Sequence, residues 1–134
     1  MMRCFAVALL VSVGLPALAA ERVKVFVFAE PDPALGGLVS AAVLDSVDDL
    51  KTLIGRRVLG YGGMSTTDKR TEATLLVQVL SRKVVDDEYR VMVRATFNGE
   101  TRELTGTDVR QWKRCVVPIA AALRDWTKAE QATR

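Results

Sequence analysis

The side chains that most often carry catalysis are scarce in this chain. It contains no histidine, so a Ser-His-Asp or Cys-His arrangement cannot be built, and the usual general base near neutral pH is missing. Cys4 lies in the N-terminal apolar run, and Cys115 borders an apolar helical stripe, three residues after Trp112. A thiol beside such a stripe is typical of a packed core, whereas a nucleophilic cysteine needs a cationic setting. We therefore expect a protein that is not an enzyme.

Acidic residues form two short clusters, Asp45 with Asp48 and Asp49, and Asp86-Asp87-Glu88. Carboxylates are calcium ligands, and two facing carboxylates can do acid–base chemistry. Neither cluster has the ligand spacing, the glycine or the terminal glutamate of an EF-hand loop. A helix start explains the first cluster and a solvated turn the second. The sequence therefore predicts no metal site and no cofactor.

A glycine-rich segment, residues 60–70, combines glycines, hydroxyls and cations. This composition invites a phosphate-binding interpretation, but the P-loop spacing is absent and no helical pattern follows. A long connecting loop is the simpler interpretation, although long loops in small domains are often functional. Its candidate binding residues are Tyr61, Ser65, Thr66, Lys69 and Arg70.

Strand alternation predicts the strongest candidate binding surface, which is one face of the sheet. In the first predicted strand, Val23, Val25 and Val27 alternate with polar and aromatic residues, and strand 88–97 alternates in the same way. If the registers agree, one sheet face carries Arg22, Lys24, Phe26, Phe28, Arg90, Met92 and Arg94. Arg82 and Arg102, with Gln78 and Thr96, are expected on the same face. Arginine and aromatic side chains are enriched at the centres of protein interfaces.

Four strands are predicted, at 22–29, 73–84, 88–97 and 100–105. They are rich in β-branched and aromatic residues. The Asp86-Asp87 pair marks one turn, and Asn98-Gly99 is a strong hairpin signal because both residues tolerate positive φ.

Two helices are predicted by apolar residues at three- and four-residue steps. The first covers 46–56, with Asp45 as a candidate cap and an extension back to Leu38. The second is capped by Thr107 or Asp108, and Pro118 predicts a kink within it. Its apolar stripe is Val109, Trp112, Val116, Ile119, Leu123 and Trp126.

The element order β-α-β-β-β-α predicts an α+β two-layer sandwich. A four-stranded, mainly antiparallel sheet would have both helices on one face. This order resembles that of small periplasmic domains such as the N-terminal domain of the TolB family; the resemblance is one of element order, and no function is carried over from it.

The N-terminus is typical of a secretory signal peptide. A positive start at Arg3 precedes an apolar run from Phe5 to Leu15, and Ala17-Leu18-Ala19 is a small-x-small cleavage site. We expect residues 1–19 to be removed, which leaves residues 20–134 as one small domain with Cys115 as its sole cysteine. No later apolar run is long enough to span a bilayer.

Composition and charge further limit the classes of function that this chain could have. The formal charge of +3 falls by one on loss of Arg3, and acidic residues interleave with basic ones, which argues against nucleic-acid binding. We expect an exported soluble domain, periplasmic or extracellular, that acts as a protein-interaction module of the bacterial cell envelope and binds another envelope protein. The alternative is a protein that binds a small ligand or cell-wall fragment, and the third is a small carboxylate-dependent enzyme.

Overall fold

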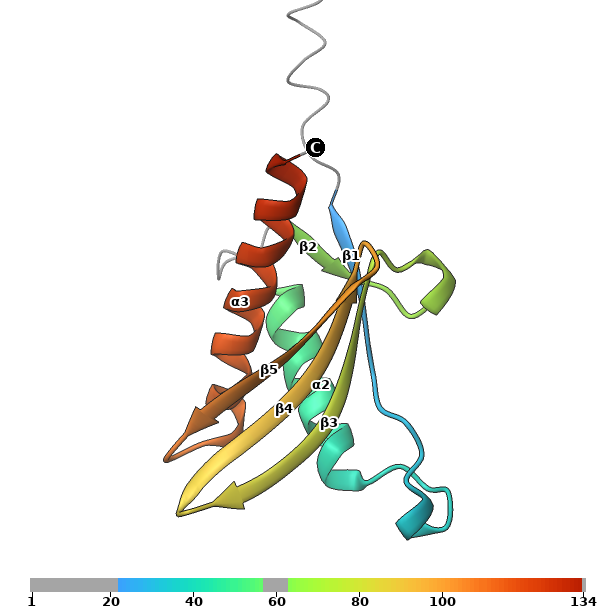
Figure 1. Cartoon of the computed structure of the whole chain (residues 1–134). Coiled ribbons are helices and arrows are strands. Elements are labelled where there is room, and N and C mark those ends of the chain that lie inside the picture. Colours follow the sequence, from blue (N-terminus) through green and yellow to red (C-terminus); the bar gives the residue numbers. More distant parts are fainter. Residues whose placement is uncertain (1–21, 57–62, 134) are drawn as a thin grey trace, which may run out of the picture.

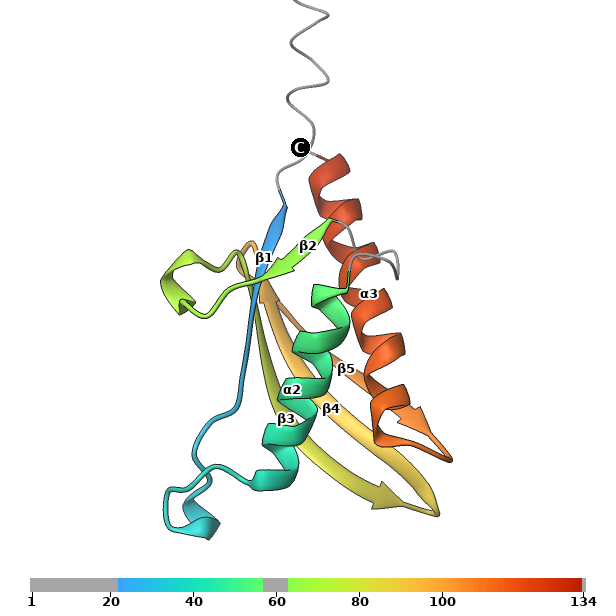
Figure 2. The same cartoon turned by 180° about the vertical axis from the view of Figure 1, so that it is seen from behind.

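A computed structural model describes residues 22–56 and 63–133 of the chain. Two helices pack against one face of a five-stranded sheet (Figures 1 and 2). The predicted α+β class, with both helices on one face, is confirmed. The predicted signal peptide, residues 1–19, lies outside the described residues. The elements are β1 (Val23–Phe28), η1 (Pro33–Leu35), α2 (Ala41–Gly55), β2 (Met64–Thr66), η3 (Arg70–Glu72), β3 (Leu75–Val85), β4 (Glu88–Phe97), β5 (Glu100–Asp108) and α3 (Trp112–Ala132).

The sheet is mixed, with strand order β2-β1-β3-β4-β5. β1 runs parallel to both of its neighbours, and β3, β4 and β5 form an antiparallel meander. The four predicted strands are present. The fifth, β2, lies within the segment expected to be a loop. It forms one edge of the sheet, and the side chain of its first residue, Met64, is buried.

Tight turns connect the meander. Asn98 and Gly99 have φ angles of 52° and 81°, and Asp86 and Asp87 have 52° and 62°. Two successive positive φ angles are characteristic of the type I′ turn, whose twist suits a two-residue hairpin. An irregularity in the β3–β4 register lies between Val79 and Ser81.

α2 begins earlier than Asp45, which is therefore not its cap. Ser40 caps it, and its hydroxyl accepts a hydrogen bond from the Val43 N–H at 3.4 Å. The helix ends at Gly55, close to the predicted end. Its buried residues include Val47, Leu50 and Ile54, which follow one another at three- and four-residue steps as predicted for a helix.

α3 begins at Trp112, later than predicted. Its N-cap residue is Gln111, which makes no side-chain cap bond, so neither Thr107 nor Asp108 caps it. Asp108 instead ends β5 and accepts the backbone N–H groups of Arg110 and Gln111, both at 2.8 Å. Val109 therefore precedes the helix and is 68% exposed, outside the predicted stripe.

The core lies between the sheet and the two helices. The alternate residues of β1, β3 and β4 that point toward the helices are almost fully buried, as is the α3 stripe from Val116 to Trp126. Gly106 of β5 allows α3 to approach closely, since a Cβ there would overlap the Cys115 carbonyl oxygen. Among the described residues, no helix is long and apolar enough to cross a membrane.

Candidate functional site

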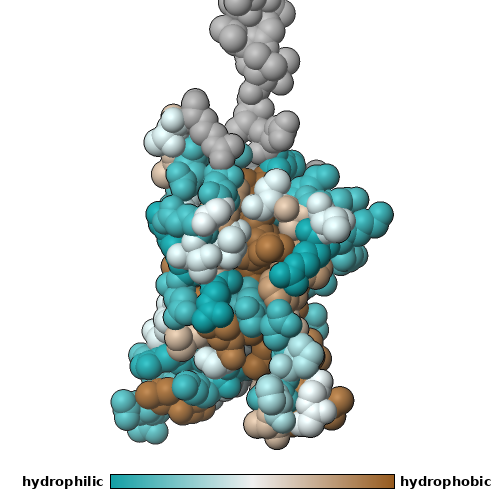
Figure 3. Space-filling view, turned by 45° about the vertical axis from the view of Figure 1, so that its right-hand side comes forward, coloured by the Kyte–Doolittle hydropathy of each residue, from teal (hydrophilic) through white to brown (hydrophobic). Residues whose placement is uncertain are grey.

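The sheet surface opposite the helices, here called the outer face, brings together the side chains predicted from strand alternation. Phe26 lies beside Leu76, which lies beside Thr96; Phe28 lies beside Gln78, which lies beside Arg94. Neither α2 nor α3 covers this surface (Figures 1 and 2). Figure 3 shows hydrophobic residues near the middle of this side of the molecule, bordered by hydrophilic ones.

An aromatic pair forms the apolar part of the outer face. The rings of Phe26 and Phe28 stack with centroids 5.4 Å apart, and both side chains are half-buried. The guanidinium of Arg70, from η3, lies 4.7 Å from the Phe28 ring centroid. Such cation–π contacts stabilise by about 0.5–1 kcal/mol at exposed sites. Arg70, predicted as a loop candidate, thus belongs to the same surface as the aromatic pair.

Two of the predicted cations on the outer face have acidic partners. Arg94 donates from Nε and Nη2 to one carboxylate oxygen of Glu103, at 3.3 and 3.0 Å. Arg90 lies 3.6 Å from Glu88. Lys24 is exposed and precedes Phe26 on the same strand face. The surface is therefore less basic than the sequence suggests, with positive charge concentrated near the aromatic pair.

Arg82 and Arg102 do not lie on the outer face, contrary to prediction. The irregularity between Val79 and Ser81 places Arg82 opposite the buried Val91, on the helical side. There it pairs with Asp45 at 3.3 Å and lies 4.5 Å from the Trp112 ring centroid.

Arg102 is opposite the buried Ala95, and its guanidinium lies 4.5 Å from the Trp126 ring centroid. Both cations thus pack on aromatic rings of α3.

The described candidate residues of segment 60–70 lie in and beside two elements, β2 and η3. Tyr61 lies outside the described residues. Ser65 and Thr66 belong to β2, so they are strand residues rather than loop residues. Lys69 precedes η3 and pairs with Glu72 at 3.7 Å. Arg22 is exposed at the start of β1.

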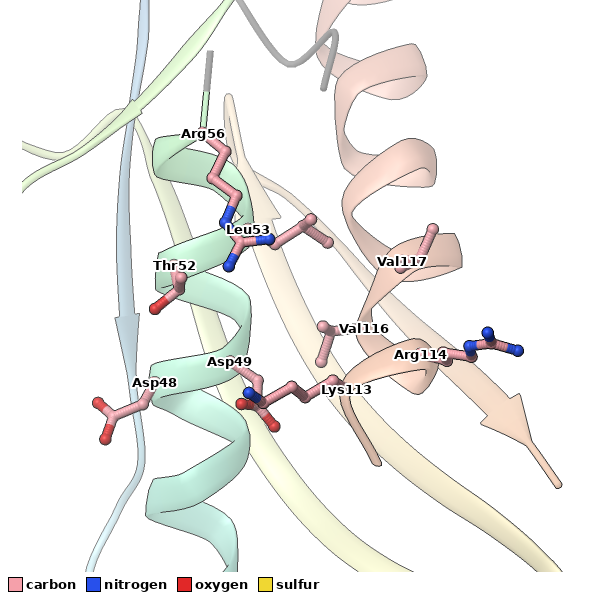
Figure 4. A pocket seen from close by; sticks show the side chains of 9 residues that line it. All are labelled: Asp48, Asp49, Thr52, Leu53, Arg56, Lys113, Arg114, Val116 and Val117. Atoms are coloured by element: carbon pink, nitrogen blue, oxygen red, sulfur yellow. The ribbon is translucent and has the colours of Figure 1, made fainter. Parts of the chain in front are cut away.

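A groove between α2 and α3 was not apparent in the sequence. It encloses a cavity of about 300 Å³ lined by Asp48, Asp49, Thr52, Leu53, Arg56, Lys113, Arg114, Val116 and Val117. Asp49 and Lys113 point toward each other across this groove, whereas the charged ends of Asp48 and Arg114 are directed away from this pair (Figure 4). A second cavity, of about 610 Å³, adjoins it and shares Asp48, Asp49 and Lys113.

Burial raises the pKa of Asp49 above its ordinary value, and the nearby cations Arg82 and Lys113 offset part of this effect. A raised pKa suits a carboxyl group that acts as a general acid. A catalytic pair of carboxyl groups needs a second one nearby. Asp48, its neighbour, also lines the cavity, but its carboxylate is directed away from Asp49 (Figure 4). The groove therefore does not present the pair of facing carboxylates that an enzyme of this kind would use.

Cys115 is completely buried, and its thiol donates to the Tyr89 carbonyl oxygen at 3.4 Å. Burial raises the pKa of this thiol, and the nearby Asp108 carboxylate adds to the increase. A nucleophilic cysteine needs the opposite shift. Within residues 22–56 and 63–133, no group of three or more Cys, Asp or Glu side chains is placed to hold a metal ion.

No protein-family model and no curated protein matches the sequence. One similar solved structure is the N-terminal domain of Protein Y from Thermus thermophilus, which is 11% identical with a TM-score of 0.43. The similarity covers 82% of this chain and 98% of that one.

Proposed function

We propose that this chain is a non-catalytic binding domain, exported to the bacterial cell envelope, that binds another envelope protein through its outer face. The observation that carries the proposal is the half-buried Phe26–Phe28 stack on the sheet face opposite α2 and α3. Aromatic side chains bury much area at low entropic cost, and they recur among the residues that dominate binding energy.

The charges around the stack indicate the chemistry of the partner. Lys24 and Arg70 flank the two rings, and Arg94 lies two strands away. A partner surface with an apolar centre and carboxylates at its rim would complement this arrangement. Nucleic acid is a poorer match, because Arg90 and Arg94 are already paired with glutamates.

The test is capture of a partner by the tagged mature protein from its own envelope fraction. The double variant Phe26→Ala/Arg94→Ala should weaken capture by about 30-fold or more, corresponding to about 2 kcal/mol for a dominant interface residue. Added salt should weaken capture further, because exposed charges are screened over about 8 Å at physiological ionic strength.

Two controls keep the result interpretable. Lys113→Ala changes the helical side of the molecule and should leave capture unchanged. Chemical denaturation should show that the double variant remains folded, since Arg94 is exposed and Phe26 is only half-buried. Equal capture by the folded double variant and the unsubstituted protein would contradict the proposal.

A further inference from the structure

The groove between α2 and α3 has a charged end and an apolar wall. Asp49 and Leu53 are four residues apart on α2 and therefore lie on one side of that helix. Lys113, Val116 and Val117 are similarly spaced on α3. The two sets of residues line the same cavity of about 300 Å³. Opposite charges thus lie at one end of a wall formed by three aliphatic side chains (Figure 4).

Asp49 and Lys113 do not form an ion pair with each other. Asp49 and Lys113 point toward each other (Figure 4), and Lys113 is close enough to lower the Asp49 pKa, yet no ion pair joins them. Arg82, the other cation that affects Asp49, is already paired with Asp45. The Asp49 carboxylate is therefore partly desolvated without an ion-pair partner among the described residues, which is unfavourable for a charged group.

We propose that this groove binds a free α-amino acid with an apolar side chain. The ammonium group of such a ligand would bind Asp49, and its α-carboxylate would bind Lys113, so that the zwitterion bridges two side chains that do not pair directly. Its side chain would lie against Val117, which is 43% exposed, and against the edges of Leu53 and Val116, which are 8% and 2% exposed. The cavity is large enough for a ligand of this size. This site is separate from the outer face, which lies on the other side of the sheet.

Binding of leucine to the purified protein, measured by titration calorimetry or by NMR chemical-shift changes, tests this site. Each charged group of the ligand is examined by blocking it: N-acetyl-leucine lacks the ammonium and leucinamide lacks the carboxylate. Either change should weaken binding at least about tenfold, because a hydrogen bond to a charged group contributes about 1.5–3 kcal/mol. Glycine, which lacks the side chain, should also bind more weakly.

The chain offers matched control variants outside the groove. Asp49→Asn and Lys113→Gln should each weaken leucine binding about tenfold or more. Asp87→Asn and Lys128→Gln should leave it unchanged, since both residues are exposed and neither lines the groove. Thermal melts check that every variant is folded.

Absence of leucine binding would overturn the proposal. So would equal binding of N-acetyl-leucine, or equal losses in the Asp49 and Asp87 variants. Tighter binding of glycine than of leucine would exclude the role of the apolar wall.

Discussion

Trp126 connects the C-terminal helix to the sheet. It is 6% exposed, meets Phe97 edge-on with ring centroids 5.8 Å apart, and has Arg102 against its face. Trp126→Ala should therefore lower the free energy of unfolding by about 3–5 kcal/mol, since it removes a large buried side chain and leaves a cavity. Urea denaturation measures the loss. Val117→Ala, at a largely exposed position of the same helix, should cost well under half as much. A loss below about 1 kcal/mol for Trp126→Ala would contradict the packing described.

Two aspartates should affect stability with opposite signs. The pKa of Asp49 is raised, chiefly by burial, so its ionised form destabilises the folded state at neutral pH. The pKa of Asp108 is lowered because two backbone N–H groups donate to it. Its contribution is therefore fully present above the ordinary aspartate value of about 4 and is lost as the pH falls through the lowered pKa.

Asp49→Asn should accordingly raise the free energy of unfolding at pH 7, and Asp108→Asn should lower it. The Asp49 difference should shrink as the pH falls through its raised pKa toward about 4. The Asp108 difference should shrink only as the pH falls below about 4, through its lowered pKa. Denaturation at a series of pH values measures both. Differences of the same sign at pH 7 would contradict the assignment.

The sequence predicts side-chain direction correctly in β1 and β4, where alternation is unbroken. Phe26, Phe28, Met92 and Arg94 follow the expected pattern because β1 and β4 are regular. Arg82 does not, because the register shift after Val79 reverses the alternation of the residues that follow. Nothing in the local sequence marks such an irregularity, so the partner strand is needed to place this residue.

α3 continues through Pro118, at an exposed position of its second turn. Proline lacks the N–H that would donate to the Arg114 carbonyl, and its ring crowds the preceding turn. Pro118→Ala should therefore raise the free energy of unfolding by about 1–3 kcal/mol, because the new side chain gives up little packing. Thermal or urea denaturation measures the gain. A loss of stability would show that the proline ring contributes contacts that outweigh the missing bond.

Element boundaries were less predictable than element types. The sequence offers several polar residues that can cap α2, and only the chain's path decides that Ser40 rather than Asp45 does so. β2 has three residues, too few to show alternation, and it forms because β1 supplies hydrogen-bonding partners along its free edge.

The groove between α2 and α3 could not be predicted from the sequence for a related reason. Periodicity identifies the buried stripe of each helix, but the flank that faces the other helix depends on their packing.

The predicted export of the chain concerns the molecule as a whole. Intact-mass measurement of the protein recovered from the periplasm or the medium should show a chain that begins at Ala20, because the apolar run ends in the Ala17-Leu18-Ala19 site. A product that retains Met1 would contradict cleavage, and retention of all of the protein in the cytoplasm would contradict export.

The position of β1 between β2 and β3 has a consequence for the order of folding. Residues of β1 pair with partners about fifty positions later in the chain, as the Lys24 N–H and Thr74 hydroxyl illustrate. The meander from β3 to β5 instead closes through two-residue turns, and such local contacts form faster than distant ones. We therefore expect the strand synthesised first to dock last. A chain crossing a membrane from its N-terminus would present β1 without either sheet neighbour, and so remain unfolded until β3 follows.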